Sequence, residues 1–178
     1  MFGNFCIGYS DAGIYLYIAD ANTITGNTCI NGLADWGTGI WVEEGTDNTV
    51  TGNTCQGNYA EGIYLSLDSS ATLVSGNTCQ GNTSDGIYVF SSINNTVTGN
   101  TCQGNTGNGI LLVSSSGNTV AGNTCQGNTL NGIYVFSTSD NNTVTGNTCY
   151  QNVRHGILLT SADGNTVTGN TCNGNDSG

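Results

Sequence analysis

Apolar and polar residues alternate with a period of two in three short runs that recur along the whole chain. In residues 132–136 (GIYVF), isoleucine and valine alternate with tyrosine and phenylalanine. In 142–146 (NTVTG) a valine lies between two threonines, and in 147–149 (NTC) a cysteine follows a threonine. Such alternation predicts short β-strands with one buried side. Glycine, asparagine and threonine separate the runs and favour tight corners, so three strands and three corners make one unit.

The unit recurs every 23 to 26 residues. Residues 48–58 and 95–105 both read NTVTGNTCQGN, and a GIYV-like phrase follows each of them after a short variable stretch. A repeat of this length cannot bury its apolar side alone, so neighbouring repeats are expected to stack into a solenoid. We predict an all-β fold, a single-stranded parallel β-helix of about seven three-strand coils. It forms a single domain over residues 1–178.

Inward positions of successive repeats form columns. One column holds the isoleucines of the GIYV phrases, a second the valines of NTVTG, and a third the cysteines. Asparagines recur at one corner and are expected to form a hydrogen-bonded ladder that fixes the register; they are Asn53, Asn77, Asn100, Asn123, Asn147 and Asn170.

The phrases NTVTGNTC and GIYV resemble the repeats of right-handed parallel β-helices of the pectin-lyase-like superfamily. The resemblance is greatest to NosD-type periplasmic proteins and to β-helix repeats of archaeal and bacterial cell-surface proteins, and it covers the whole chain. It implies a right-handed coil. It implies no single function, because such coils carry lyases, hydrolases, adhesins, tailspikes and structural surface proteins.

Composition restricts the partners. One arginine, no lysine and twelve acidic residues give a net charge of −11, which argues against phosphate neutralisation and therefore against a nucleic-acid partner. No apolar run is long enough for membrane insertion. Both ends of the sequence fall within a coil and show no polar capping repeat. This predicts a fragment or an end-to-end stacking unit with uncapped ends.

The cysteines allow two interpretations. They fill a narrow inward column as small apolar side chains, or they pair between adjacent rungs, whose separation falls within the range that a disulfide spans. Pairing would require an oxidising, extracellular or cell-surface location. Their spacing is not that of a zinc site. The possible pairs are Cys6 with Cys29, Cys55 with Cys79, Cys102 with Cys125, and Cys149 with Cys172.

Two outward faces are candidates for function. An aromatic face predicts lateral association with further copies of the chain or stacking against a glycan. The alternative is that aromatic residues are simply common in β-strands. The face comprises Tyr15, Tyr17, Trp41, Tyr64, Tyr88, Phe90, Tyr134 and Phe136. A threonine array resembles the T-x-T faces of ice-binding proteins, the alternative again being strand preference. It comprises Thr23, Thr25, Thr49, Thr51, Thr96, Thr98, Thr143, Thr145, Thr166 and Thr168, and departs from the pattern at residues 73–75 and 119–121.

Evidence for catalysis is thin. Polysaccharide lyases of the pectin-lyase-like superfamily, which this chain resembles, combine acidic calcium ligands with a basic residue. Hydrolases need paired carboxylates. The basic candidates are Arg154 and His155. Glu61 and Asp85 occupy equivalent positions of adjacent rungs and could bind calcium, although solvated loop acids are the favoured interpretation. We therefore assign no catalytic residue, and no cofactor beyond this calcium alternative.

The sequence favours a non-enzymatic extracellular structural protein, a self-assembling surface or filament-forming module. Ice binding through the threonine array is the alternative. Carbohydrate binding or polysaccharide cleavage is the third possibility, and it draws on Trp41 and on the loop 30–37, which carries an insertion and places Trp36 at a corner.

Overall fold

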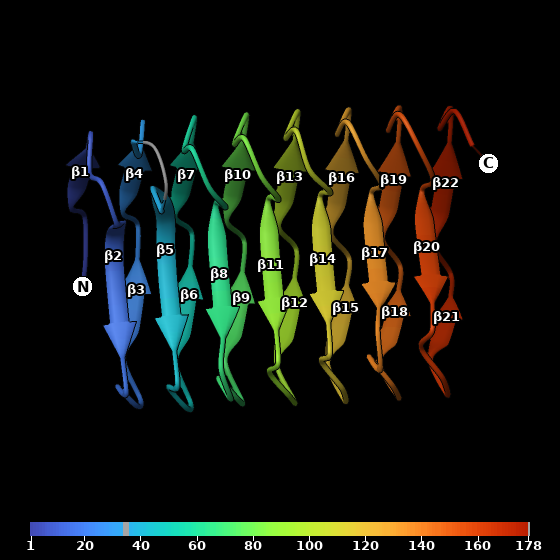
Figure 1. Cartoon of the computed structure of the whole chain (residues 1–178), viewed down its shortest axis with the longest axis horizontal. Helices are drawn as coiled ribbons and strands as arrows, with labels where there is room; N and C mark the ends of the chain where they lie inside the picture. The colour runs from blue at the N-terminus through green and yellow to red at the C-terminus, as the bar shows by residue number, and fades with distance from the viewer. Residues whose placement is uncertain (34–35, 178) are drawn as a thin grey trace.

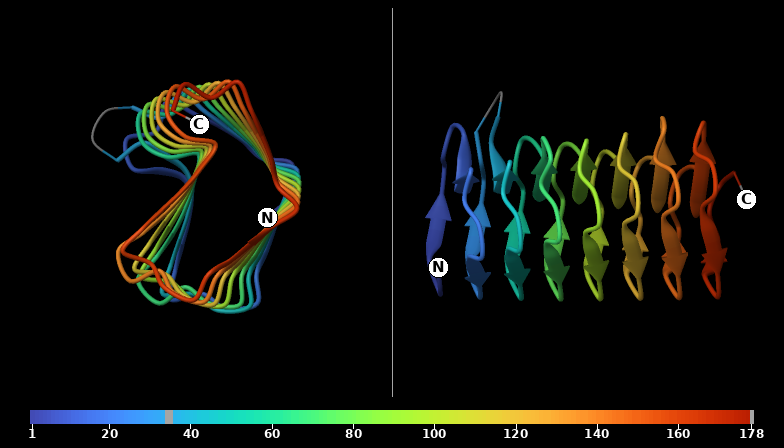
Figure 2. Two further views of the ribbon diagram at one scale, coloured as in Figure 1. Left: turned by 90° about the vertical axis from the view of Figure 1, so that its right-hand side faces the viewer. Right: turned by 90° about the horizontal axis from the view of Figure 1, so that it is seen from below.

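The computed structural model describes residues 1–33 and 36–177, and in this part of the chain the only regular elements are short β-strands. They form three parallel sheets along the long axis of the molecule (Figure 1). Seen along that axis the coils nearly superpose (Figure 2). The predicted right-handed, three-sided parallel β-helix is confirmed.

The first sheet, here the cysteine sheet, contains eight strands: β1 (Phe5–Ile7), β4 (Thr28–Ile30), β7 (Thr54–Gln56), β10 (Thr78–Gln80), β13 (Thr101–Gln103), β16 (Thr124–Gln126), β19 (Thr148–Tyr150) and β22 (Thr171–Asn173). The second, the aromatic sheet, contains β2 (Ala12–Tyr17), β5 (Thr38–Glu43), β8 (Ile63–Ser66), β11 (Ile87–Phe90), β14 (Ile110–Val113), β17 (Ile133–Phe136) and β20 (Ile157–Thr160). The third, the threonine sheet, contains β3 (Thr23–Thr25), β6 (Thr49–Thr51), β9 (Leu73–Ser75), β12 (Thr96–Thr98), β15 (Thr119–Ala121), β18 (Thr143–Thr145) and β21 (Thr166–Thr168).

The register places like residues above one another. Ile87 pairs with the isoleucines of both neighbouring rungs. In the other two sheets, Val97 pairs with two valines and Cys102 with two cysteines. The inward side chains of the middle rungs are fully buried, so the predicted columns form one continuous core. No helix in the described residues is long and apolar enough to cross a membrane.

Asparagines line three corners of the coil rather than one. At the predicted corner, Asn53 Nδ2 donates to Asn77 Oδ1 at 3.0 Å and to the Ile24 carbonyl at 3.0 Å. A second ladder follows the cysteine sheet and contains Asn58, Asn82, Asn105, Asn128, Asn152 and Asn175. A third precedes the threonine sheet, where Thr72 replaces asparagine; its members are Asn22, Asn48, Asn95, Asn118, Asn142 and Asn165. The ladders satisfy corner amides that would otherwise be buried without partners.

The first and last strand of each sheet have a neighbour on one side only. Such edges offer free backbone groups for pairing. The end-to-end stacking predicted from the sequence stays a prediction.

Candidate ligand-binding face

Four aromatic side chains stack along the outer face of the aromatic sheet. Tyr15, Trp41, Tyr64 and Tyr88 occupy equivalent positions of successive rungs. Their ring centroids are separated by 4.7, 5.5 and 5.0 Å, with angles of 33°, 27° and 14° between ring planes. In-register pairing of parallel strands thus produces an aromatic ladder, the name used below for these four residues.

The aromatic ladder is not a flat platform. Rings at these separations and angles cannot lie side by side in one plane, because their edges would collide; they lie offset and face to face. Their faces are therefore used in contacts with one another, while ring edges and phenol hydroxyls point outward. Accordingly Trp41, Tyr64 and Tyr88 are half-buried.

The predicted aromatic face is divided in two. Leu111 of β14 follows Tyr88 in the column and interrupts the stack. Beyond it, Tyr134 and Phe136 form a separate pair at 5.4 Å, whereas Phe90 packs beside Tyr88 at 5.9 Å. All eight predicted residues lie on this sheet. Ring stacking stops at Leu111, but Leu111 and Val113 continue the apolar columns between the two aromatic groups. Their role in assembly or ligand binding stays a prediction.

Trp36 extends the ladder sideways. Its indole lies nearly parallel to that of Trp41, with centroids 6.3 Å apart and 11° between planes, and the residue is 62% exposed. Ala34 and Asp35, which belong to the loop singled out in the sequence, lie outside the described residues. Both tryptophans of the chain therefore meet at one place. The repeat pattern does not predict this pairing, because an inserted loop has no counterpart in the other repeats.

Polar contacts fix the ring orientations. The Tyr15 hydroxyl donates to the Glu43 carboxylate, and Trp41 Nε1 donates to Ser66 Oγ at 2.8 Å. Burial raises the pKa of Tyr88 to about 12 and that of Tyr64 above its usual range. The outward phenols therefore remain protonated at neutral pH and can donate hydrogen bonds.

The two calcium candidates lie beside the start of the aromatic strands. Glu61 accepts hydrogen bonds from Thr38 Oγ1 at 3.2 Å and from Ser84 Oγ at 2.9 Å. Asp85 Oδ1 accepts from the backbone N–H of Asn108 and from its Nδ2. Asp85 is only 6% exposed, so the expectation of a solvated loop acid is wrong for this residue. Among the described residues no group of three acidic, histidine or cysteine side chains could hold a metal ion.

Asp85 should make stability depend on pH. Burial raises the pKa of Asp85 to about 6. The charge of the nearby Glu61 also raises it, whereas the hydrogen bonds from Asn108 lower it. The folded protein therefore binds a proton more tightly than the unfolded chain. The contribution of protonated Asp85 to the free energy of unfolding is fully present below about pH 4, the usual pKa of an aspartate. It is lost as the pH rises through about 6.

Asp85→Asn is expected to increase the free energy of unfolding by about 2–3 kcal/mol at pH 8 and to change it little below pH 4. Asparagine already occupies this position in the next two coils, as Asn108 and Asn131, so it fits the corner. Urea denaturation at both pH values measures the effect, with the exposed Asp68→Asn as control. An equal effect of Asp85→Asn at both pH values would contradict the assignment.

The basic side chains lie far from these acids. Arg154 and His155 precede β20, three rungs beyond the strand that follows Asp85. At about 4.8 Å per rung the separation is about 14 Å. The structure therefore does not bring them together as an acid–base pair.

The cysteines lie in register in a buried column. Cys79, for example, pairs with Cys55 and Cys102, and all three are fully buried. All eight are free thiols in the structure. Hydrogen bonding to Cys125 and burial hold the pKa of the Cys149 thiol well above its usual range. The disulfide pairs stay a prediction.

The threonine array lies on the outer face of the threonine sheet. Leu73 and Ser75 of β9 separate the threonines of β6 from those of β12. Some hydroxyls are used within the sheet, since Thr98 Oγ1 donates to the Ala121 carbonyl at 2.9 Å. Ice binding by this face stays a prediction.

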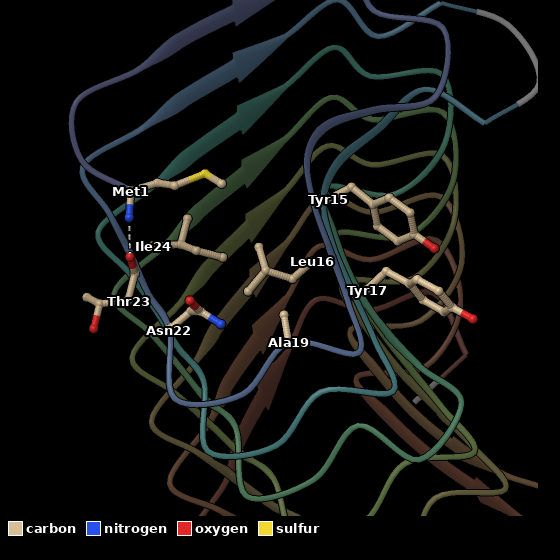
Figure 3. A pocket seen from close by; sticks show the side chains of 8 residues that line it. All are labelled: Met1, Tyr15, Leu16, Tyr17, Ala19, Asn22, Thr23 and Ile24. Atoms are coloured by element: carbon tan, nitrogen blue, oxygen red, sulfur yellow. Dashed lines mark hydrogen bonds between the residues drawn. The ribbon is translucent and has the colours of Figure 1, made fainter.

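A pocket of about 250 Å³ opens at the N-terminal end of the stack (Figure 3). Apolar side chains such as Leu16 and Ile24 point into it from the first coil, and the Met1 amine donates to the Thr23 carbonyl at its rim. None of its lining residues is a carboxylate or an imidazole. The pocket is thus the end of the core, with no arrangement for chemistry.

The fold, the repeat and the corner ladders define a class, the right-handed parallel β-helix proteins. Within it, residues 3–149 and 82–178 match the family described as "Periplasmic copper-binding protein (NosD)". The chain belongs to this family. No curated protein sequence matches the chain.

Several solved structures share the fold at low sequence identity. A mutant of the periplasmic alginate epimerase AlgG is 19% identical, with a TM-score of 0.81. The match covers 96% of this chain and 47% of the epimerase chain. The A-module of the Azotobacter vinelandii mannuronan C-5 epimerase AlgE4 is 17% identical with a TM-score of 0.69, covering 96% and 55%. The Dettilon tailspike protein is 20% identical with a TM-score of 0.79, covering 97% and 41%. This chain therefore spans about half the length of these proteins.

The residues present do not fit a copper site. Copper favours imidazole, thioether and thiolate ligands. The chain has one histidine and one methionine, His155 and Met1, which lie in the last and first coils. The middle cysteines are fully buried, and hydrogen bonding to Cys125 and burial hold the pKa of the Cys149 thiol well above its usual range. We derive no copper chemistry for this chain.

Proposed function

We propose that this chain is a polysaccharide-binding β-helix of the cell envelope or the extracellular space, and that it holds its ligand at the Trp36–Trp41 pair. The observation that carries the proposal is the parallel arrangement of the two indoles with Trp36 62% exposed. Sugar rings pack their C–H faces on exposed aromatic faces. Trp36 offers such a face, whereas the rings of the aromatic ladder are occupied by one another.

The surrounding polar groups suit a glycan. The phenol hydroxyls of Tyr64 and Tyr88 can donate to sugar oxygens, and the Glu43 carboxylate can accept from sugar hydroxyls in addition to its bond from Tyr15. A site that combines aromatic surface with a few oriented polar groups is typical of small-ligand recognition. Two of the structurally similar proteins are named as alginate and mannuronan epimerases, one of them periplasmic, which supports both the ligand class and the location.

The proposal is binding rather than cleavage. General acid–base chemistry requires both groups within hydrogen-bond reach of the substrate. Here His155 and Arg154 lie about 14 Å from Asp85, three rungs away. Self-assembly, which the sequence favoured, is the second candidate, and the apolar columns that continue through Leu111 and Val113 are the surface that lateral packing would use.

Trp36→Ala is expected to weaken oligosaccharide binding by about tenfold or more, since an exposed aromatic anchor dominates such contacts. The probes are β-1,4-linked hexasaccharides of glucose and mannose and their C6-carboxylate counterparts, titrated by calorimetry. Phe136→Ala is the matched control, because it removes a ring that is 37% exposed on the same sheet, beyond the interruption at Leu111. In the unaltered protein, binding should change tryptophan fluorescence. Absence of binding by every probe, or an equal loss in the control, would contradict the proposal.

A further inference from the structure

Three acidic side chains lie on or beside β5, the strand that carries Trp41. Glu43 ends β5, the strand that carries Trp41, and Glu44 follows it at an exposed corner. Glu61 precedes the next strand and contacts Thr38 of β5 through its carboxylate. The aromatic surface is thus bordered by carboxylates on both ends of its strands.

The arginine side chain is remote from this surface. The chain has a single arginine and no lysine. Arg154 lies three residues before β20, which is five strands from β5 in the sheet order, or about 24 Å away at about 4.8 Å per rung. That exceeds the Debye length of about 8 Å at physiological ionic strength, so its charge is screened at the site.

From this charge distribution we infer that the ligand at the Trp36–Trp41 pair is an uncharged polysaccharide rather than a polyuronate. The inference rests on the proposed function. A polyuronate would place one carboxylate per sugar beside Glu43, Glu44 and Glu61, with no cation to pair it, and like charges across an interface are costly. Neutral sugar hydroxyls can instead donate to Glu43 and accept from the phenols, so every polar group finds a partner.

The test uses sugars that differ only at C6. The hexaoses of β-1,4-linked mannose and glucose carry a hydroxymethyl group there, and the corresponding mannuronate and glucuronate hexasaccharides carry a carboxylate. We expect at least one neutral hexaose to bind about tenfold or more tightly than its acidic counterpart. Because no ion pair is involved, its affinity should change less than about twofold between 0.05 and 0.5 M NaCl.

Calcium provides the opposing arm of the experiment, because a divalent cation could bridge acidic sugars to acidic side chains. Each titration is repeated with calcium and with a chelator. If an acidic hexasaccharide binds as tightly as its neutral counterpart, with or without calcium, the inference is overturned while polysaccharide binding stands. If no hexasaccharide binds, the proposed function fails, and the inference with it.

Glu44→Gln tests the electrostatic cause. Glu44 is exposed and lies at the corner after β5, so the substitution removes charge near the site without removing a core contact. We expect the affinity for the acidic hexasaccharide to rise by about threefold and that for the neutral hexaose to stay within about twofold. An unchanged ratio of the two affinities would contradict repulsion as the reason for the preference.

Discussion

Gly86→Ala should destabilise the solenoid by about 3 kcal/mol or more, because the new methyl group has no space. A Cβ at Gly86 would lie 2.6 Å from the Gly109 carbonyl oxygen, 2.9 Å from Cys102 Cβ and 3.0 Å from Asn105 Nδ2. The carbonyl is fixed by the sheet, and the other two atoms are fully buried. None of them can move without shifting a rung.

This glycine represents a column. The glycine before the inward isoleucine recurs in every middle coil, and at each of these positions a Cβ would meet the carbonyl oxygen of the next glycine at 2.4–2.6 Å; the members are Gly39, Gly62, Gly86, Gly109 and Gly132. The cysteine column packs against it. In each of these coils a cysteine side chain therefore lies opposite a glycine.

The control is Gly104→Ala. Gly104 has a positive φ of 61° and nothing within 4 Å of the position of a Cβ. Its substitution should cost about 1 kcal/mol through backbone strain alone. Urea denaturation of both variants separates crowding from backbone strain. A cost for Gly86→Ala no greater than that for Gly104→Ala would contradict the packing described here.

Asn105→Ala should reduce the free energy of unfolding by about 4 kcal/mol, since each buried group that loses its partner costs about 1–3 kcal/mol. Asn105 is fully buried, and its Oδ1 accepts from the Asn82 amide at 3.0 Å and from Asn82 Nδ2 at 2.9 Å. Its Nδ2 donates to Asn128 Oδ1 at 3.0 Å and to the Cys79 carbonyl at 3.2 Å. Alanine removes all four interactions.

Gln103→Ala is the matched control for the ladder variant. Gln103 is exposed on β13, two residues from Asn105, and its removal should change stability by less than about 0.5 kcal/mol. Chemical denaturation gives both values. Hydrogen exchange should also show faster exchange of the Asn82 amide in Asn105→Ala. Normal protection of that amide, or equal costs for the two variants, would show that the ladder contributes little.

The repeat made most of the fold predictable. Strand alternation and the spacing of the cysteines indicated three sheets and the inward columns, and the register observed for Cys79 and Cys102 follows from that spacing. Two of the three asparagine ladders were missed. Their asparagines flank glycine or threonine and resemble ordinary turn residues, and only the path of the backbone shows that they point inward.

The site was less predictable for two physical reasons. Ring orientation depends on side-chain torsions and on rung separation, so the sequence indicated an aromatic column but not that Tyr64 and Tyr88 cover each other's faces. Trp36 lies in an inserted loop without a counterpart in other coils, so periodicity could not place it beside Trp41. The burial of Asp85 was missed because a single acid in a loop phrase is usually solvated.

A crystal structure of the protein with the neutral hexaose that binds most tightly tests glycan recognition at Trp36 directly. We predict a sugar ring parallel to the exposed face of Trp36, with hydroxyls within hydrogen-bonding distance of Glu43. A ligand bound on the threonine sheet, or Trp36 covered by a second copy of the chain, would contradict glycan recognition at this site.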